Sequence, residues 1–574
     1  MMGTLRLRAT LLWGCAVLAL AGCQQGTGGR SFRPKKMVIP AGIAGTVTEY
    51  ADLVGADEML VRGYGVVVGL GQAGSDEVRA DVRNYLVQEM LKAGLGSYVR
   101  GTQRLTPRQM LRDKDTAVVV VAARIPPGAP VGTRFDVFVQ ALPKSQTLSL
   151  DGGVLMSTKL RLGLSTAVGT AGEIKDWALG RGPIFVNPFI DRADPTQQAK
   201  LRAGRVPGGG VVSRGRSLRL QLRSPDLRVV SLIARRLNER FGGLGDVATS
   251  KSASMIELRV PSTWRYDHEH FLQLVRHVYL WGGPAEDEKY AKQLKDAILQ
   301  PAALYEDIAL VWEAMGRRVL GIIQPLYTST NPAAAFHATR TGLRLEDALA
   351  IDPMIRFARQ ANSPYQISAI RALGRARWSV QPVHTLRGML SEPNELVRVA
   401  AYEALMDHGP TGAVQRVKIS QDFVMDIVDT DRDYAIYATQ TGPAKIVLFG
   451  RSVPIRRPVF YCPPDDLVTI NAPETAKEVT VYRRIPRTGQ MSDAFRVDPH
   501  AHSLIKTLGR APELAVNGEV DGLGFTYSQV VSILYGLCKA KHIPADFVLQ
   551  RSPAMQRIYM AISPVSRSDM PEDE

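Results

Sequence analysis

A run of glycines near residue 70 has a spacing that could bind a cofactor. Gly69, Gly71 and Gly74 follow the order Gly-x-Gly-x-x-Gly, between a predicted strand at 59–68 and a predicted helix at 77–92. In dinucleotide-binding folds, such glycines bring the backbone close to a pyrophosphate at a helix N-terminus. The next predicted strand, 117–125, is not followed by the Asp or Glu that would hold the ribose. We therefore predict that these glycines serve the backbone and that no cofactor is bound.

Histidines near residue 270 are the other residues whose spacing suggests chemistry. His270 and His277 share one face of a predicted helix at 268–281, which Asp267 precedes. No His-Glu-x-x-His pattern and no cysteine accompanies them, as a zinc site would require. Asp267 is typical of a helix N-cap, so we predict a polar helix start and no metal. Because no motif joins an acid, a base and a nucleophile, we predict that the chain is not an enzyme.

The N-terminal residues are typical of an exported lipoprotein. Two arginines precede an apolar stretch at 11–20, which is shorter than the roughly 20 residues that span a bilayer. Residues 20–23, Leu-Ala-Gly-Cys, resemble the lipobox in which the signal peptidase cuts before a lipidated cysteine, here Cys23. Ordinary cleavage near Ala21, with Cys23 incidental, is the alternative. Gln24, where an aspartate would favour the inner membrane, points to the outer membrane.

Composition and charge fit a large folded protein of the cell envelope. The 574 residues are 45% apolar and 22% charged, and the net charge is +16; this balance is ordinary for globular proteins, and the length predicts several domains. An exported protein rarely meets nucleic acid, so we predict none as a partner. Peptidoglycan, anionic lipid headgroups and lipopolysaccharide are the polyanions that such a charge would meet.

Two cysteines remain as thiols after lipidation of Cys23. Cys462 and Cys538 are separated by 76 positions, and cysteines in an oxidising compartment usually pair. We predict a Cys462–Cys538 disulfide. The sequence leaves open whether their Cα atoms come close enough to form it.

Periodicity predicts a multidomain α+β fold. A signal peptide at 1–22 and a tether at 23–38 precede a mixed α/β region at 39–285, with further strands at 134–140, 218–222 and 255–260 and a helix at 227–241. Ser224-Pro225-Asp226 precedes that helix and Gly242-Gly243 follows it, as helix ends favour. A mixed β/α domain at 415–560 contains predicted strands at 435–439, 445–450, 467–470 and 478–483 and a helix at 527–540. The polar residues 561–574 are predicted to be disordered.

The block at 286–414 is predicted to be helical, with a weak internal repeat. Small and apolar residues around Ile370 recur 32 positions later around Tyr402. Each unit is predicted to be helix–turn–helix, and the block resembles HEAT repeats. Because two visible units are too few for a free-standing solenoid, we expect this block to lean on neighbouring helices or on a partner.

Five stretches of the mixed region, in order, resemble the family of flagellar P-ring proteins. They lie at 62–76, which contains Gly63 and Gly65 as well as the glycines above; at 117–137, with Pro126-Pro127-Gly128; at 145–158; at 204–210, with Val206-Pro207-Gly208; and at 218–241. The resemblance covers about 40–285. Glycines 63, 65, 69 and 71 would permit positive φ or close backbone approach. The two proline-containing motifs are predicted to stop strands and turn the chain.

The resemblance implies a structural role. A P-ring subunit would assemble with copies of itself around the flagellar rod, in the periplasm and peptidoglycan layer, and would contact other rings of the basal body. The lipobox, which would anchor the protein to the outer membrane, and the helical block depart from the family pattern. A non-flagellar outer-membrane lipoprotein scaffold, whose helical repeats bind a partner, is therefore the alternative, and a cell-wall hydrolase is a more distant one.

Overall fold

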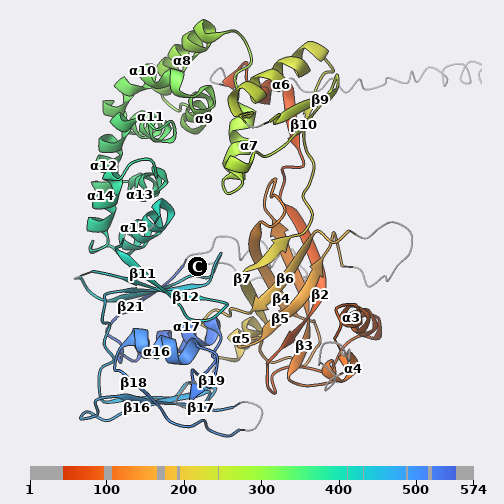
Figure 1. Ribbon diagram of the computed structural model, residues 1–574, viewed down its shortest axis with the longest axis vertical. Helices are drawn as coiled ribbons and strands as arrows, with labels where there is room; N and C mark the ends of the chain where they lie inside the picture. The colour runs from red at the N-terminus through yellow and green to blue at the C-terminus, as the bar shows by residue number, and fades with distance from the viewer. Residues whose placement is uncertain are drawn as a thin grey trace, which may run out of the picture.

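The computed structural model describes residues 43–95, 106–164, 175–190, 194–243, 245–409, 412–430, 432–485, 489–514 and 520–550. The predicted signal peptide, Cys23, the tether and residues 561–574 lie outside them. The predicted multidomain α+β class is confirmed (Figure 1). In the described part of the chain, no helix is both long and apolar enough to cross a membrane.

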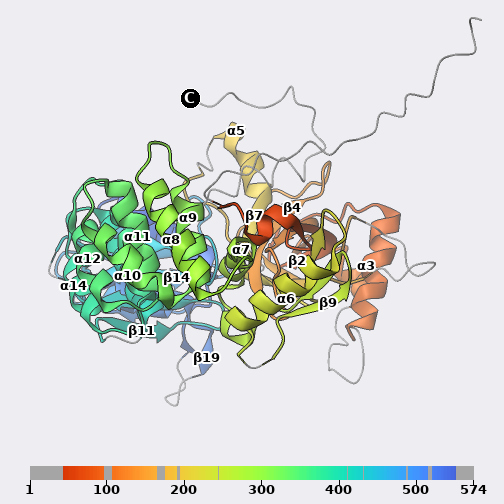
Figure 2. The same cartoon turned by 90° about the horizontal axis from the view of Figure 1, so that it is seen from above.

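A closed antiparallel barrel forms the centre of the N-terminal half. Its order is β2-β3-β4-β7-β6-β5. Val119 and Val121 of β3 point into the barrel, whereas Val118 lies under the covering helix α3, because successive side chains of a strand point to opposite faces. Figure 2 shows α3 on the side of the barrel that faces away from the helical block. The bounds are β2 (Met59–Val68), α3 (Ala80–Lys92), α4 (Pro107–Met110), β3 (Thr116–Ile125), β4 (Arg134–Ala141), β5 (Val154–Leu160), β6 (Ala178–Pro183) and β7 (Ala203–Val212).

A second, smaller unit packs around a separate hydrophobic cluster beside the barrel. Its antiparallel sheet has the order β1-β8-β10-β9, with α6 and α7 packed on it. The α6 helix begins after Asp226, whose carboxylate accepts from the backbone N–H groups of Arg228 and Val229. Gly242 ends it at φ −81°, so the predicted left-handed glycine is wrong there. The small unit comprises α2 (Val47–Tyr50), β1 (Ala51–Val54), β8 (Leu218–Leu222), α6 (Leu227–Phe241), β9 (Ala248–Ser252), β10 (Met255–Leu258) and α7 (His268–His277).

The helical block forms an arc of two helix layers (Figure 1). Ile370 and Tyr402 are both fully buried where α13 packs on α15. Gly374 allows this approach, because a Cβ there would lie 2.6 Å from Cα of Ala404. Leu310 of α9 enters the core of the small unit, so the block leans on its neighbour. Its helices are α8 (Pro284–Ile298), α9 (Tyr305–Met315), α10 (Leu320–Ile323), α11 (Pro332–Arg344), α12 (Ile351–Arg359), α13 (Gln366–Arg375), α14 (Gln381–Met389) and α15 (Glu395–His408).

The C-terminal domain places two helices between two sheets. The first sheet, β11-β12-β14-β13-β21, alternates its faces: Val447 packs on the helical block, and Leu448 packs on α16 and α17. A second sheet, β15-β16-β17-β18, covers the other side of these helices. The bounds are β11 (Val414–Lys418), β12 (Val424–Val428), β13 (Ala435–Ala438), β14 (Lys445–Phe449), β15 (Val459–Tyr461), β16 (Val468–Ala472), β17 (Val479–Arg483), β18 (Phe495–Val497), α16 (Ala501–Gly509), β19 (Glu513–Leu514), β20 (Val520–Asp521), α17 (Tyr527–Lys539) and β21 (Asp546–Leu549).

The predicted Cys462–Cys538 disulfide is not formed in the structure, where both thiols are free. Tyr461 packs against Gly536 of α17, so its side chain faces the helix layer. Cys462 follows at the end of β15, is exposed and contacts Asp466. Since neighbouring side chains of an extended chain point to opposite faces, Cys462 is directed away from the helix that carries Cys538.

Candidate functional site

Glycines of the 62–76 motif bring the walls of the barrel close together. A Cβ on Gly63 would lie 2.3 Å from the carbonyl oxygen of Lys159, and one on Gly65 would lie 2.6 Å from Oγ1 of Thr158. Both contacts cross from β2 toward β5, the two strands whose pairing closes the barrel. A larger residue at either position would hold these strands apart.

The next glycines of the motif form a turn at the end of β2. Gly69 and Gly71 have φ values of +83° and +63°, which side-chain-bearing residues rarely adopt. The backbone N–H of Gly71 donates to Oδ1 of Asp115 at 2.7 Å, and that of Gly74 donates to the carbonyl of Lys114 at 2.9 Å. Donors that would face a pyrophosphate are therefore used within the chain.

The surroundings of this turn also differ from those of a dinucleotide site. β2 pairs antiparallel with both β3 and β5, whereas the dinucleotide fingerprint belongs to a parallel β-α-β unit. A Cβ on Gly74 would lie 2.1 Å from the carbonyl oxygen of Thr116, so the turn packs tightly on the start of β3. The geometry is that of a barrel closure.

The two proline motifs have different outcomes. β3 ends at Ile125, where Pro126-Pro127-Gly128 turns the chain as predicted. The turn packs on the small unit, since a Cβ on Gly128 would meet Leu272 at 2.6 Å. The prediction that Val206-Pro207-Gly208 stops a strand is wrong, because β7 continues through it from Ala203 to Val212. The pairing of β4 with β7 shifts register between Phe135 and Val137, and this bulge accommodates a proline without an N–H.

The bulge in turn binds the C-terminal domain. Oδ1 of Asp136 accepts from the backbone N–H of Gly208 at 2.7 Å and from that of Gly442 at 2.9 Å. The buried Arg205 lies 3.5 Å from the same carboxylate and donates to the carbonyl of Gln440 at 3.1 Å. Burial raises the pKa of Asp136 above its usual value, against the effect of both backbone hydrogen bonds. One carboxylate therefore joins β4, β7 and the loop before β14.

A second contact joins the barrel to α17. The hydroxyl of Ser528 donates to Oδ1 of Asp151 at 2.8 Å and accepts from the backbone N–H of Val186 at 3.1 Å. Phe185 enters the core of the C-terminal domain, with its ring 5.6 Å from that of Tyr527. Asp151, like Asp136 and Arg205, lies within a motif of the family resemblance, although sequence analysis did not assign these residues a role. Their partners in the C-terminal domain lie more than 200 positions away, so no local pattern could have found them.

The histidines join α7 to the helical block. Nε2 of His270 lies 2.6 Å from Oε1 of Glu313, and Nε2 of His277 lies 3.1 Å from Oδ1 of Asp307. Among the described residues, no three His, Cys, Asp or Glu side chains are grouped as a metal site would need. Asp267 occupies the predicted N-cap position, and its backbone carbonyl accepts from the N–H of Phe271 at 3.1 Å. Its carboxylate does not cap the helix as predicted, because Oδ2 accepts from Arg344 at 3.0 Å.

These polar groups connect four bodies: the barrel, the small unit, the helical block and the C-terminal domain. Residues of the family-like motifs, Asp136, Asp151 and Arg205, lie where the barrel meets the C-terminal domain. Residues 46–282 match the family model described as flagellar P-ring protein, which confirms the predicted resemblance for the barrel and the small unit.

Curated relatives give the same result. The segment is similar to the flagellar P-ring proteins of Anaeromyxobacter dehalogenans strain 2CP-C, 33% identical over 39% of this chain and 57% of that protein, and of Geobacter metallireducens, 32% identical over 38% and 56%. The flagellar P-ring protein of Thermotoga petrophila is 30% identical over 40% of this chain and 66% of that protein. The chain spans little more than half the length of the first two relatives, and the helical block and C-terminal domain lie outside the matched segment.

Proposed function

We propose that this chain is a structural subunit of a flagellar basal-body P-ring, assembled from copies of itself around the rod in the periplasm. The match of 46–282 to the flagellar P-ring family carries the proposal, since it covers the whole barrel and the small unit. On this proposal the protein performs no enzymatic step. Its role is to hold a ring of fixed shape against a turning rod.

The architecture suits such a role. A ring requires a heterologous contact that is repeated around an axis until it closes, and every subunit must hold the two contacting surfaces in a constant orientation. A closed barrel has no free strand edge, which favours a defined contact over indiscriminate strand pairing. The ties at Asp136 and Asp151 hold the C-terminal domain against the barrel, so both would move as one body.

We further propose that lipid on Cys23 anchors the ring to the outer membrane, next to the peptidoglycan. The lipobox at 20–23 supports this proposal, and several acyl chains on one cysteine would make the attachment firm. A Cys23→Ser variant should remain an uncleaved precursor that no longer fractionates with the outer membrane. Normal fractionation of this variant would contradict the anchor without bearing on the ring.

The helical block favours one alternative, a non-flagellar envelope scaffold that reuses the P-ring fold. It lies beyond the matched segment and ties the small unit to the C-terminal domain, so its surface is available for a partner of another system. Deletion of the gene separates the two proposals. The ring proposal predicts basal bodies that lack the ring and cells that do not swim, whereas intact basal bodies and normal swimming would leave only the alternative.

A further inference from the structure

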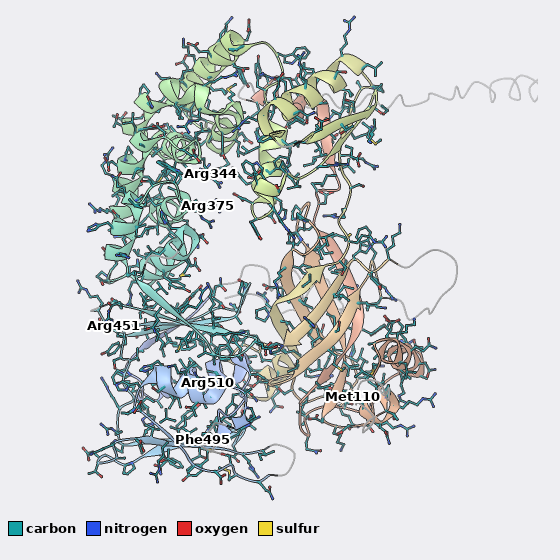
Figure 3. The ribbon with its side chains drawn as sticks, in the orientation of Figure 1. Met110, Arg344, Arg375, Arg451, Phe495 and Arg510 are labelled. Carbon is teal, nitrogen blue, oxygen red and sulfur yellow. The ribbon has the colours of Figure 1, made fainter. Side chains whose placement is uncertain are left out.

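Four arginines gather on the inner face of the helical arc. Arg340 and Arg344 lie one turn apart on α11, and Arg371 and Arg375 lie one turn apart on the neighbouring α13, so each pair shares a helix face. They line a cavity of about 340 Å³, together with Leu343, Ala372 and Trp378 among others. Figure 3 shows Arg344 and Arg375 on the inner side of the arc. We name this cavity the arginine groove.

Carboxylates at the rim neutralise three of these arginines. Arg340 pairs with Glu306 at 2.6 Å and Arg344 with Asp267 at 3.0 Å. Arg371 lies 3.8 Å from Glu403, too far for a direct hydrogen bond. Glu346, which also lines the groove, pairs with Arg317 outside it.

Arg375 is the exception. Within the described ranges, its guanidinium has no ion pair and no hydrogen bond. Arg375 is an exposed residue, and partial burial and the charge of Arg344 lower its pKa, while Asp267 and Asp407 act on it in the opposite direction. A guanidinium offers five N–H donors, and those of Arg375 border a cavity large enough for several side-chain atoms. The groove therefore fits a carboxylate.

The lining favours a peptide over a simple anion. Leu343, Ala372 and Trp378 give one wall an apolar surface beside the guanidinium groups, and Trp378 is 37% exposed. Peptide recognition combines such an apolar wall with charged anchors. A planar guanidinium also binds a carboxylate through two parallel hydrogen bonds.

The chain itself contains a segment of matching chemistry. Residues 569–574 read Asp-Met-Pro-Glu-Asp-Glu, with four acids in six residues of a chain whose net charge is +16. Met570 and Pro571 are the apolar residues of this segment. This segment lies outside the described residues.

The segment is tethered within reach of the groove. The last described strand, β21, ends at Leu549, and Val548 packs against the core of the helical block. The residues between Leu549 and Asp569 could extend to roughly 60 Å. Packed neighbouring helices lie only about 8–10 Å apart, and α13 lies beside α15, so the linking residues are long enough to cross several helices of the block. Tethering gives the segment a local concentration of roughly millimolar.

We propose that residues 569–574 bind in the arginine groove of the same chain, with a carboxylate on Arg375. This bound segment would tie the far end of the C-terminal domain to α11 and α13 and would cover the groove. The inference does not depend on the proposed ring function, because it uses only the groove and the charge of the segment.

The test uses the mature chain, a form that ends at Ser568, and a fluorescent peptide of residues 564–574. The peptide should bind the shortened form saturably, with affinity that falls as salt rises, and should bind the mature chain roughly tenfold or more weakly, because the tethered segment occupies the groove. Arg375→Glu in the shortened form should abolish binding. Arg359→Glu, a charge reversal on an exposed position of the outer helix α12, should leave it unchanged.

Two further readouts complete the test. Circular dichroism should show that Arg375→Glu and Arg359→Glu melt like the parent. A peptide with lysine in place of its four acids should bind Arg375→Glu better than the parent, which loss of folding could not produce. Four outcomes would each overturn the proposal. The peptide could bind the mature and shortened chains equally, or its binding could be insensitive to Arg375→Glu. The segment could instead hold two mature chains together as a dimer, or the groove could bind phosphorylated glycolipid but not the peptide.

Discussion

Asp136 should be the residue on which the docking of the C-terminal domain depends most. Its Oδ1 accepts two backbone N–H groups, from Gly208 at 2.7 Å and Gly442 at 2.9 Å, and its Oδ2 lies 3.5 Å from the buried Arg205. Asp136→Ala removes the acceptor of both N–H groups and the carboxylate beside a buried cation. Removing one partner from such a buried set costs about 3–5 kcal/mol.

The neutral isostere separates geometry from charge. Asp136→Asn retains an oxygen for the two N–H groups and loses only the charge beside Arg205, and burial already disfavours that charge by raising the pKa of Asp136. We therefore expect Asp136→Asn to cost about 1–2 kcal/mol. Asp52→Ala is the matched control, because Asp52 also pairs with an arginine, Arg223, but is 59% exposed; exposed pairs contribute at most about 1 kcal/mol.

Amide hydrogen exchange measures the effect at the contact itself. Peptides that cover β7 and β13–β14 should exchange roughly a hundredfold faster or more in Asp136→Ala, since each 1.4 kcal/mol is about tenfold. Asp136→Asn should give a smaller change, and Asp52→Ala should leave these peptides unaffected. If these peptides exchange no faster in Asp136→Ala than in Asp52→Ala, Asp136 is not the residue that ties the barrel to the C-terminal domain.

Three further perturbations test other parts of the structure. Gly71→Val places a β-branched residue at φ +63° and should destabilise the barrel by about 2 kcal/mol or more in chemical denaturation. Gly243→Val should cost little, because an added Cβ there would meet no atom within 4 Å; equal effects of the two variants would contradict the account of the turn. Cys462 should react with maleimide faster than Cys538, because Cys462 is exposed and burial raises the pKa of Cys538 to about 12. Mass spectrometry that finds the two cysteines joined in envelope-derived protein would contradict the free thiols. Burial lowers the pKa of His337 to about 4, whereas its unfolded pKa is about 6.5, so the fold loses stability as pH falls from about 6.5 toward 4. A fall from pH 7 to 5 should therefore destabilise the parent by about 1–2 kcal/mol more than it destabilises His337→Gln. His384→Gln, at an exposed position, should lose as much stability as the parent.

Local patterns predicted the elements whose residues carry strong periodicity or end signals. The strands at 59–68 and 117–125 match β2 and β3 within a residue, because runs of valine suit a strand that is buried on both faces. The helix at 227–241 matches α6, since Pro225 and Asp226 mark its start. The repeat around Ile370 and Tyr402 was visible because both positions face the same helix contact.

Features that depend on distant contacts could not be predicted. Closure of the barrel requires β5 to pair with β2 across 86 or more positions, which no local pattern specifies. Pro207 favoured a turn, but the bulge opposite it lets β7 continue. Asp136 and Gly442 lie 306 positions apart, so their contact is apparent only in the folded chain. The predicted disulfide failed for a related reason: the facing direction of Cys462 depends on how β15 lies on α17.

Labelled basal bodies would test the proposed ring most directly. Purified basal bodies from cells that carry an epitope on this protein should be imaged by electron microscopy, with the epitope labelled and the rod as reference. The proposal predicts label on a ring around the rod at the level of the peptidoglycan, in many copies per basal body. Basal bodies with a complete ring and no label would contradict it.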